Sequence, residues 1–235
     1  MTAPRLVVLF DVDGTLIATE GRSRHSRAFT TAFEMVYGVP CRFTSALHGM
    51  TDMQIFRHVA KSMGLDDDRG SELAREACRR MVEVYGVADP GDGRYIMLPG
   101  VRETLERLVA EGALLGLVTG NPPEIAEHKL SSVGVNDYFR FGAFGTEAED
   151  RGELPPLAIR RAEELIGASI PPQEVFVIGD TPRDIACAQE SCCRSVAVAT
   201  GMFAPADLEP LGPDLVLPDL SDQSKLWRMM GIEDE

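Results

Sequence analysis

The sequence has no long hydrophobic run and comparatively few cationic side chains. No stretch approaches the roughly 18 uninterrupted apolar residues of a membrane span, and the opening residues MTAPRLVVLFDVDG hold too short an apolar run for a signal peptide. Lysine and arginine together number 23 against 37 aspartate and glutamate residues, which gives a net charge of −14. That charge repels nucleic-acid phosphates and anionic membrane surfaces. We therefore expect a cytoplasmic protein that binds neither nucleic acid nor membrane.

Cysteine is also scarce, and its spacing excludes the usual roles of cysteine clusters. There is no CxxC pair and no histidine nearby, so the sequence indicates neither a zinc site nor a disulfide framework. We expect reduced, structural thiols, with a redox role for the adjacent pair Cys192 and Cys193 as the alternative. The five cysteines are Cys41, Cys78, Cys187, Cys192 and Cys193.

What is present is the balance of a globular protein with a sizeable core. The 235 residues are 44% hydrophobic and 26% charged. Four apolar segments read as buried strands, each ending in small or acidic residues: 6–10, 114–118, 174–178 and 195–199. Helical patterns lie between them at 101–111, 122–133 and 156–167. This alternation predicts an α/β fold with a doubly wound, Rossmann-like parallel sheet and a ligand site at the carboxyl ends of its strands.

The pattern changes between residues 19 and 97. Apolar residues such as Phe29, Phe33 and Phe56 recur there at helical spacing with no strand between them, and turn-forming runs close the segment at 89–93 and 98–100. We expect a core domain made of residues 1–18 and 98–235, with an all-helical cap domain over 19–97.

Two acidic residues directly follow the first predicted strand. Asp11 and Asp13 sit two apart beside Gly14, whose missing side chain lets a ligand approach the backbone. Two such carboxylates repel each other unless a cation lies between them, and Mg²⁺ prefers oxygen ligands. With a metal bound, one carboxylate can act as nucleophile while the other protonates a leaving oxygen. The alternative is a solvated aspartate turn.

A second acidic cluster, Asp180 and Asp184, follows the third predicted strand. Either residue can simply cap the helix that Pro182 begins. Two acidic clusters on parallel strands nevertheless favour one shared metal. Between them in sequence, Thr119, Gly120 and Asn121 precede a helix, where a hydroxyl and backbone N–H groups can bind a phosphate or, alternatively, only cap the helix.

The chain resembles the haloacid dehalogenase superfamily. Asp11-Val-Asp-Gly-Thr-Leu16 is similar to its first motif, Thr119-Gly-Asn to its second and Gly179-Asp-Thr-Pro-Arg-Asp184 to its fourth. The helical insert and Leu98-Pro-Gly-Val101 resemble the phosphoglycolate phosphatase and β-phosphoglucomutase-like branch, which carries a small helical cap.

This resemblance implies a Mg²⁺-dependent phosphatase that forms an aspartyl-phosphate intermediate. It implies that Asp11 attacks phosphorus, that Asp13 protonates the leaving alcohol and later activates water, and that Thr119 with nearby N–H groups binds phosphoryl oxygens. Metal ligation then falls to Asp11, Asp180 and the main-chain carbonyl of Asp13, with Asp184 orienting the metal's surroundings.

One motif departs from the family pattern. The third motif of the family is a lysine, usually followed by proline, yet no lysine occurs between residues 130 and 224. Arg151 is the nearest cation, about two residues out of place if Pro156 is aligned with the usual prolines. A guanidinium can bind phosphate in a bidentate manner, so we expect Arg151 to replace the lysine. The alternative is an exposed loop arginine.

The insert supplies the candidates for substrate contact. We expect these contacts among Arg22, His25, His48, Thr51 and Asp52, with packed or surface histidines as the alternative. The sequence therefore predicts hydrolysis of a small phosphorylated metabolite by a monomer or homodimer. A phosphomutase, a dehalogenase and a non-catalytic phosphate-binding module are the rival predictions, and the missing lysine favours the last of them.

Overall fold

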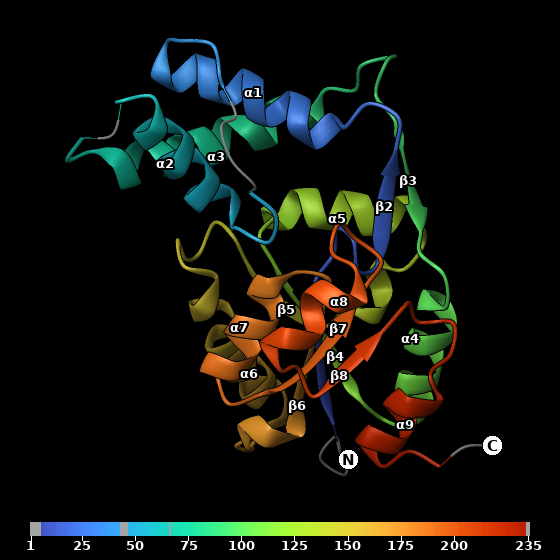
Figure 1. The fold of residues 1–235 in the computed structure, drawn as a ribbon. Helices are drawn as coiled ribbons and strands as arrows, with labels where there is room; N and C mark the ends of the chain where they lie inside the picture. Colours follow the sequence, from blue (N-terminus) through green and yellow to red (C-terminus); the bar gives the residue numbers. More distant parts are fainter. Residues whose placement is uncertain (1–5, 43–46, 66, 234–235) are drawn as a thin grey trace.

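The structure is a computed structural model that describes residues 6–42, 47–65 and 67–233. Its centre is a six-stranded parallel sheet with strand order β5-β4-β1-β6-β7-β8 (Figure 1). The central strand β1 has parallel neighbours on both sides, and this explains why its run Val-Val-Leu-Phe is buried throughout. The strands are β1 Val7–Phe10, β4 Leu114–Thr119, β5 Phe141–Phe144, β6 Val175–Gly179, β7 Arg194–Val198 and β8 Leu215–Leu217.

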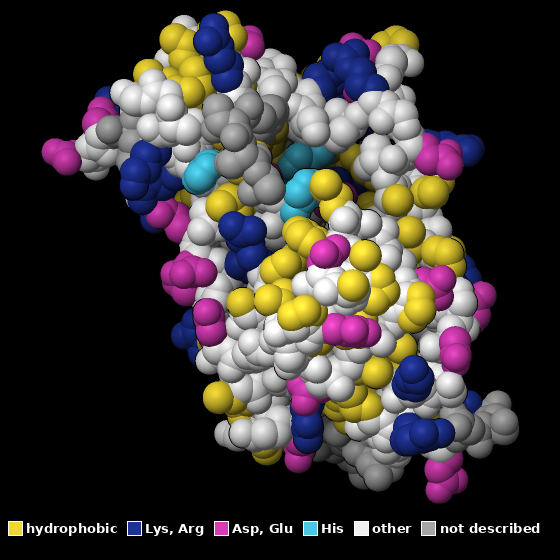
Figure 2. Space-filling view, in the orientation of Figure 1, with side chains coloured by type: hydrophobic (Ala, Val, Ile, Leu, Met, Phe, Trp, Pro, Cys, Tyr) yellow, Lys and Arg dark blue, Asp and Glu magenta, His cyan; other side chains and the backbone are white. Residues whose placement is uncertain are grey.

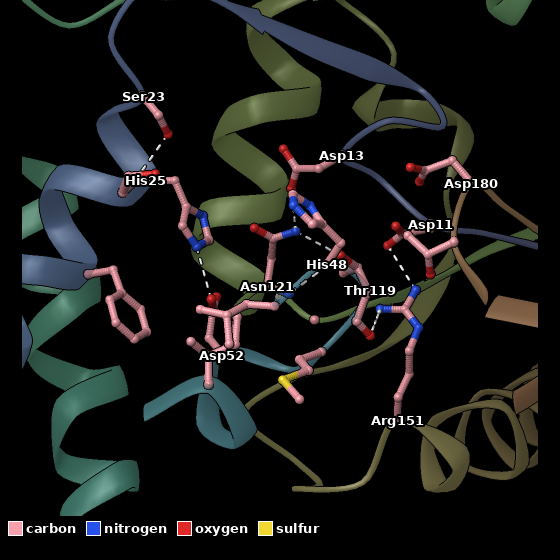
Figure 3. Close-up of a pocket in the computed structure, with 18 of the residues that line it drawn as sticks. Asp11, Asp13, Ser23, His25, His48, Asp52, Thr119, Asn121, Arg151 and Asp180 are labelled. Atoms are coloured by element: carbon pink, nitrogen blue, oxygen red, sulfur yellow. Dashed lines mark hydrogen bonds and ion pairs between the residues drawn. The ribbon is translucent and has the colours of Figure 1, made fainter. Parts of the chain in front are cut away.

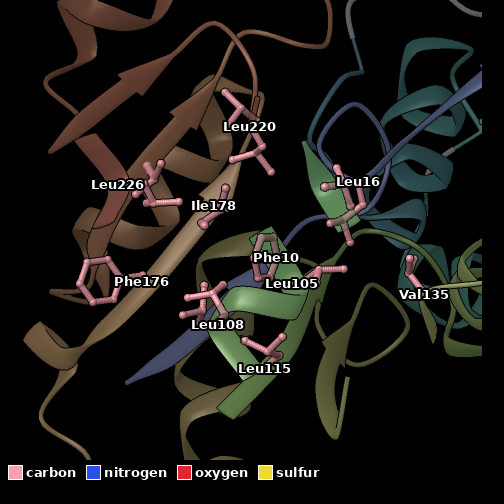
Figure 4. Close-up of a cluster of buried hydrophobic side chains, with 14 of the residues drawn as sticks. Phe10, Leu16, Leu105, Leu108, Leu115, Val135, Phe176, Ile178, Leu220 and Leu226 are labelled. Atoms are coloured by element: carbon pink, nitrogen blue, oxygen red, sulfur yellow. The ribbon is translucent and has the colours of Figure 1, made fainter. Parts of the chain in front are cut away.

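Helices cover both faces of the sheet, as the strand–helix alternation predicts. Alternate residues of β1 point to opposite faces of the sheet. Val8 and Phe10 join the core cluster under α4, α5 and α9, of which Figure 4 shows Phe10 and its neighbours. Val7 and Leu9 join the cluster under α6 and α7. The doubly wound fold is therefore confirmed. These helices are α4 Val101–Ala110, α5 Pro123–Ser132, α6 Leu154–Ile166, α7 Pro182–Glu190 and α9 Ser224–Met230, and a short α8 spans Pro205–Leu208.

Three further helices form a separate layer over the carboxyl ends of the strands (Figure 1). Within this helical layer, the Phe29 and Phe56 rings stack with their centroids 3.9 Å apart. The side chains of Ser23 and Thr51 cap the first two helices, and Gly38 ends the first in a left-handed conformation. The helices are α1 Arg24–Tyr37, α2 Asp52–Ser62 and α3 Gly70–Gly86.

The expectation that no strand interrupts residues 19–97 was wrong at both ends of the segment. β2 Ile17–Glu20 and β3 Arg94–Met97 pair antiparallel and form a two-stranded ribbon between the sheet and the helical layer. Each strand has only four residues with at most partial alternation of burial, so periodicity alone does not reveal it. The helical layer is thus joined to the core by a hydrogen-bonded ribbon rather than by two free linkers.

None of the described helices is long and apolar enough to cross a bilayer.

All five cysteines are free thiols, and burial raises the pKa of Cys41 to about 11 and those of Cys187 and Cys193 to about 12. Cys193 is buried, whereas its neighbour Cys192 is exposed.

Candidate active site

Polar residues from three adjacent strands meet at one edge of the sheet. Asp11 follows β1, Thr119 ends β4 and Asp180 follows β6. A cavity of about 320 Å³ lies there, between the sheet and the helical layer (Figure 3). In the space-filling view, histidine side chains gather at this same junction (Figure 2). The ligand site expected from the strand ends is therefore a real cavity, and the helical layer forms its other wall.

Three carboxylates crowd together on the sheet side of the cavity. Asp11, Asp180 and Asp184 each offer an oxygen atom within 4.8 Å of the others, and all three side chains are buried. Burial raises the pKa of Asp11 to about 6, with Asp184 adding to the rise and Arg151 opposing it. Burial, together with Asp184 and Asp11, raises the pKa of Asp180 to about 8. Such a cluster is unfavourable by itself and suits a hard divalent cation.

Gly14 makes room for the carboxylate of Asp180, and not for a ligand as the sequence predicts. It has a φ of +84°, and a Cβ atom there would lie 2.4 Å from Oδ2 of Asp180. The Thr15 hydroxyl donates a hydrogen bond to Oδ1 of the same carboxylate at 3.1 Å. The space that the missing side chain leaves is thus occupied by Asp180, and Gly14 does not line the cavity.

Asp184 has the helix-cap role that the sequence left open and also belongs to the carboxylate cluster. One oxygen accepts from the backbone N–H and hydroxyl of Thr181, which completes a capping box at the start of α7. The other oxygen accepts from Arg151. Both carboxylate oxygens therefore have protein partners.

Arg151 lies beside the predicted nucleophile. It starts a 3₁₀ turn, η2 Arg151–Glu153, and its side chain is 4% exposed. The guanidinium nitrogen Nη2 lies 3.1 Å from Oδ1 of Asp11 and also donates to Asp184. These two carboxylates outweigh the desolvation of the guanidinium, so the pKa of Arg151 is raised further above its usual value. The alternative of an exposed loop arginine is excluded.

The Asn121 side chain faces both Thr119 and Asp13. The Asn121 side-chain amide donates to Thr119 Oγ1 at 2.7 Å and to Asp13 Oδ2 at 2.8 Å. Gly120 contacts the helical layer, because its carbonyl accepts from the Asp52 backbone N–H at 2.9 Å. Thr119 and Asn121 are buried and line the cavity, as does Gly120.

A family model for haloacid dehalogenase-like hydrolases matches residues 6–191. The chain belongs to the haloacid dehalogenase-like hydrolases. The resemblance drawn from the first, second and fourth motifs is confirmed, and so is the prediction of a hydrolase of this family.

Curated relatives and solved structures extend this family assignment. The phosphoglycolate phosphatase of Shigella boydii serotype 4 is 26% identical over 229 residues, covering 92% of this chain and 89% of the relative. That of Aliivibrio fischeri is 27% identical over 213 residues, covering 89% and 91%. The crystal structure of a β-phosphoglucomutase from Clostridium difficile matches with a TM-score of 0.67 at 17% identity, covering 96% of each chain. This structural likeness shows a shared fold.

Sequence reasoning missed the second buried cation of this haloacid dehalogenase-like hydrolase. Lys129 on α5 is 1% exposed, and its ammonium lies 2.6 Å from Asp13 Oδ2 and 2.7 Å from Asn121 Oδ1. Desolvation alone raises the pKa of Asp13, but Lys129 and the Asn121 amide outweigh it and hold that pKa below its usual value. A signal was present, because Lys129 falls on the buried stripe of α5 with Ile125, Ala126 and Leu130.

The helical layer brings only some of its predicted contacts to the cavity of the hydrolase. His25, His48 and Asp52 line it, and His25 Nε2 lies 2.9 Å from Asp52 Oδ1. Thr51 does not line it, because its buried hydroxyl caps α2 and donates to the Glu149 carbonyl at 2.8 Å. Arg22 is likewise outside, in an exposed ion pair with Asp89.

Proposed function

We propose that this chain is a Mg²⁺-dependent phosphatase that hydrolyses a small phosphate monoester through an aspartyl-phosphate on Asp11. The observation that carries the proposal is the pairing of each of two carboxylates with its own buried cation, Asp11 with Arg151 and Asp13 with Lys129, in one cavity. The curated relatives named phosphoglycolate phosphatase support the reaction class.

The residues divide the chemistry between them. Asp11 attacks phosphorus and forms the phosphoenzyme, while Asp13 gives a proton to the leaving alcohol and later takes one from the attacking water. Arg151 faces Asp11 and places positive charge where the phosphoryl oxygens arrive, which is what phosphoryl transfer chiefly requires. Thr119 and the backbone around Gly120 complete the phosphate subsite.

The metal site is part of the same proposal. Asp11 and Asp180 would hold Mg²⁺ together with the main-chain carbonyl of Asp13, and Asp184 would act through Arg151, because its own oxygens are engaged. When bound, the ion supplies charge that offsets the crowded carboxylates and the substrate phosphate. The raised pKa values of Asp11 and Asp180 support a cation at this place.

We also propose that the helical layer acts as a cap. Its residues His25, Phe29, His48 and Ile55 line the cavity opposite the carboxylates, so the alcohol part of the ester is expected to lie against them. A cap that closes over the ester excludes water and selects the alcohol group. We propose for this cap the division expected from the sequence, residues 19–97 against a core of 1–18 and 98–235.

Phosphate release from a panel of phosphorylated metabolites and p-nitrophenyl phosphate tests the proposal, with Mg²⁺ and with chelator. We expect release that requires the metal and is abolished by Asp11→Asn, whose fold is checked by circular dichroism. Release that continues in Asp11→Asn contradicts the nucleophile assignment. Transfer of the phosphoryl group to a second hydroxyl in place of water identifies a mutase, and binding of phosphate without turnover identifies a non-catalytic module.

A further inference from the structure

A chain of hydrogen bonds runs from the helical layer to Asp13 through a buried lysine. Asp52 on α2 contacts His25 on α1 at 2.9 Å, and His25 Nδ1 contacts Lys129 Nζ on α5 at 3.1 Å. Lys129 in turn lies 2.6 Å from Asp13 Oδ2, in the loop after β1. Figure 3 shows His25 directed toward Asp52 in the wall of the cavity. The two halves of the site are therefore connected through polar side chains.

The donors and acceptors of this chain have only one arrangement. A lysine ammonium carries three N–H donors and no acceptor. The structure gives Lys129 three acceptors, namely Asp13 Oδ2, Asn121 Oδ1 and His25 Nδ1. Since His25 Nδ1 must accept, the ring proton lies on Nε2 and is donated to Asp52. Every N–H of the ammonium is thus engaged, and one of them is engaged only because the helical layer is in place.

The same geometry holds one oxygen of Asp13 and leaves the other to the cavity. Both Lys129 and the Asn121 amide donate to Oδ2. The Asp13 side chain still has 45% of its surface accessible, and the residue lines the cavity. A carboxyl group held at Oδ2 presents Oδ1 in a defined direction. Oδ1 carries the proton that passes to the leaving alcohol, and the same oxygen takes a proton back from the attacking water.

We propose that Lys129 is a positioning residue that holds Asp13 in the orientation needed to protonate the leaving alcohol, and that His25 and Asp52 make this hold complete only when the helical layer covers the site. The inference rests on the proposed phosphatase function and adds to it a link between cap closure and the acid. When the layer moves away, Lys129 loses the acceptor on His25, and one of its N–H groups is left without its protein partner. The Lys129 ammonium can then shift, and it fixes the orientation of the Asp13 side chain less firmly.

The test compares two esters that differ in how much they need an acid. p-Nitrophenolate leaves readily without a proton, whereas the alkoxide of glycerol 2-phosphate does not. Lys129→Met keeps the length of the side chain and removes its donors. We expect kcat for glycerol 2-phosphate to fall about 100-fold, in line with the loss of general acid catalysis, with a fall of less than about tenfold for p-nitrophenyl phosphate. Lys129→Gln, which retains N–H donors, is expected to recover part of the loss.

The helical-layer end of the chain is tested separately. His25→Phe removes the acceptor, and we expect the same difference between the two esters with a smaller fall in kcat for glycerol 2-phosphate. If Lys129→Met fails to fold, this variant still tests whether the hydrogen-bond chain positions Asp13. Asp52→Asn keeps an oxygen acceptor for His25 and should retain the wild-type ratio, whereas Asp52→Leu should not. Lys61→Met, at an exposed position on α2, is the matched control.

The outcomes separate this inference from the function on which it rests. Equal losses on both esters in Lys129→Met mean that the lysine only supports the structure, and wild-type rates mean that it does not position Asp13; either result overturns the inference alone. A wild-type protein that releases phosphate from neither ester, with Mg²⁺ present, overturns the proposed function and the inference together.

Discussion

The backbone N–H of Asp52 donates a hydrogen bond to the carbonyl of Gly120 at 2.9 Å, and this joins the first turn of α2 to the loop that follows β4. The contact is possible because Gly120 has no side chain. A Cβ atom there would lie 2.3 Å from the Met50 carbonyl oxygen, too close for the two segments to keep their positions. The helical layer and the phosphate loop of the proposed site therefore meet backbone to backbone.

Gly120→Ala should prevent this close approach. We expect the helical layer to shift by about an ångström and kcat/KM for a small phosphate ester to fall on the order of 100-fold, while the sheet core stays folded. Steady-state kinetics and thermal melting measure the two effects. Gly86→Ala is the control, because its added methyl group meets nothing within 4 Å. Unchanged kinetics in Gly120→Ala show that the layer tolerates the displacement.

Removal of Arg151 should cost both stability and activity. The substitution Arg151→Met leaves Asp11 and Asp184 buried without their cation, which typically costs about 3–5 kcal/mol. Urea titration measures this loss, and Mg²⁺ should offset part of it by occupying the carboxylate cluster. The same variant should lose most phosphatase activity. The control is Arg160→Met, at an exposed position on α6. Full activity in Arg151→Met means that another group supplies the charge of the missing motif lysine.

Metal-free protein should lose stability as the pH rises. The folded pKa values of Asp11 and Asp180 are about 6 and about 8, against 3.8 for an ordinary aspartate. From pH 3.8 to about 8, the folded chain therefore holds protons that the unfolded chain has released, and the free energy of unfolding falls with increasing pH. The pKa of His128 is lowered, chiefly by burial, and this makes the free energy of unfolding rise with increasing pH near pH 6.5.

Thermal melting in chelator between pH 5 and pH 9 measures this slope. Asp180→Asn removes the carboxyl group with the larger pKa shift and leaves His128 unchanged. The melting temperature of this variant should therefore vary less with pH than that of the wild type. Saturating Mg²⁺ should flatten the wild-type curve as well. Parallel curves for wild type and Asp180→Asn would show that the carboxylate cluster does not hold these protons.

Phe56 should contribute more to the stability of the helical layer than to that of the sheet. Its ring is fully buried and stacks on Phe29, and Phe56→Ala typically costs about 3–5 kcal/mol at such a site. The chain has one tryptophan, Trp227, which lies in the sheet core. We expect circular dichroism to report helix loss at a lower urea concentration than Trp227 fluorescence does. Coincident transitions in this variant would mean that layer and sheet unfold as one unit.

The site residues that can be predicted from the sequence are those at the carboxyl ends of the strands. Asp11, Thr119 and Asp180 follow buried apolar runs, and the carboxyl ends of parallel strands meet at one edge, so their proximity follows from topology alone. Arg151 could be predicted only through the family resemblance. Its burial depends on the fold of η2 against α7, which no local pattern in its loop encodes.

Lys129 and the β2–β3 ribbon escaped prediction for physical reasons. A charged residue on the apolar stripe of a helix is usually read as a break in the pattern, although an ammonium with three acceptors can be buried at modest cost. The link from His25 to Lys129 joins residues 104 positions apart, and so needs the tertiary structure. The ribbon pairs four-residue strands whose side chains are only partly buried, so their pattern is weak.

The hydrogen bond from Thr15 to Asp180 spans 165 positions of the chain. Loops of that length close late, after local helices and neighbouring strands have formed. During synthesis Asp11 therefore emerges long before its partners, and the carboxylate cluster does not exist until β6 has joined the sheet beside β1. If the proposed metal site is correct, metal can bind only after β6 has joined the sheet, and a chain that stops before β6 contains Asp11 but lacks Asp180 and Asp184.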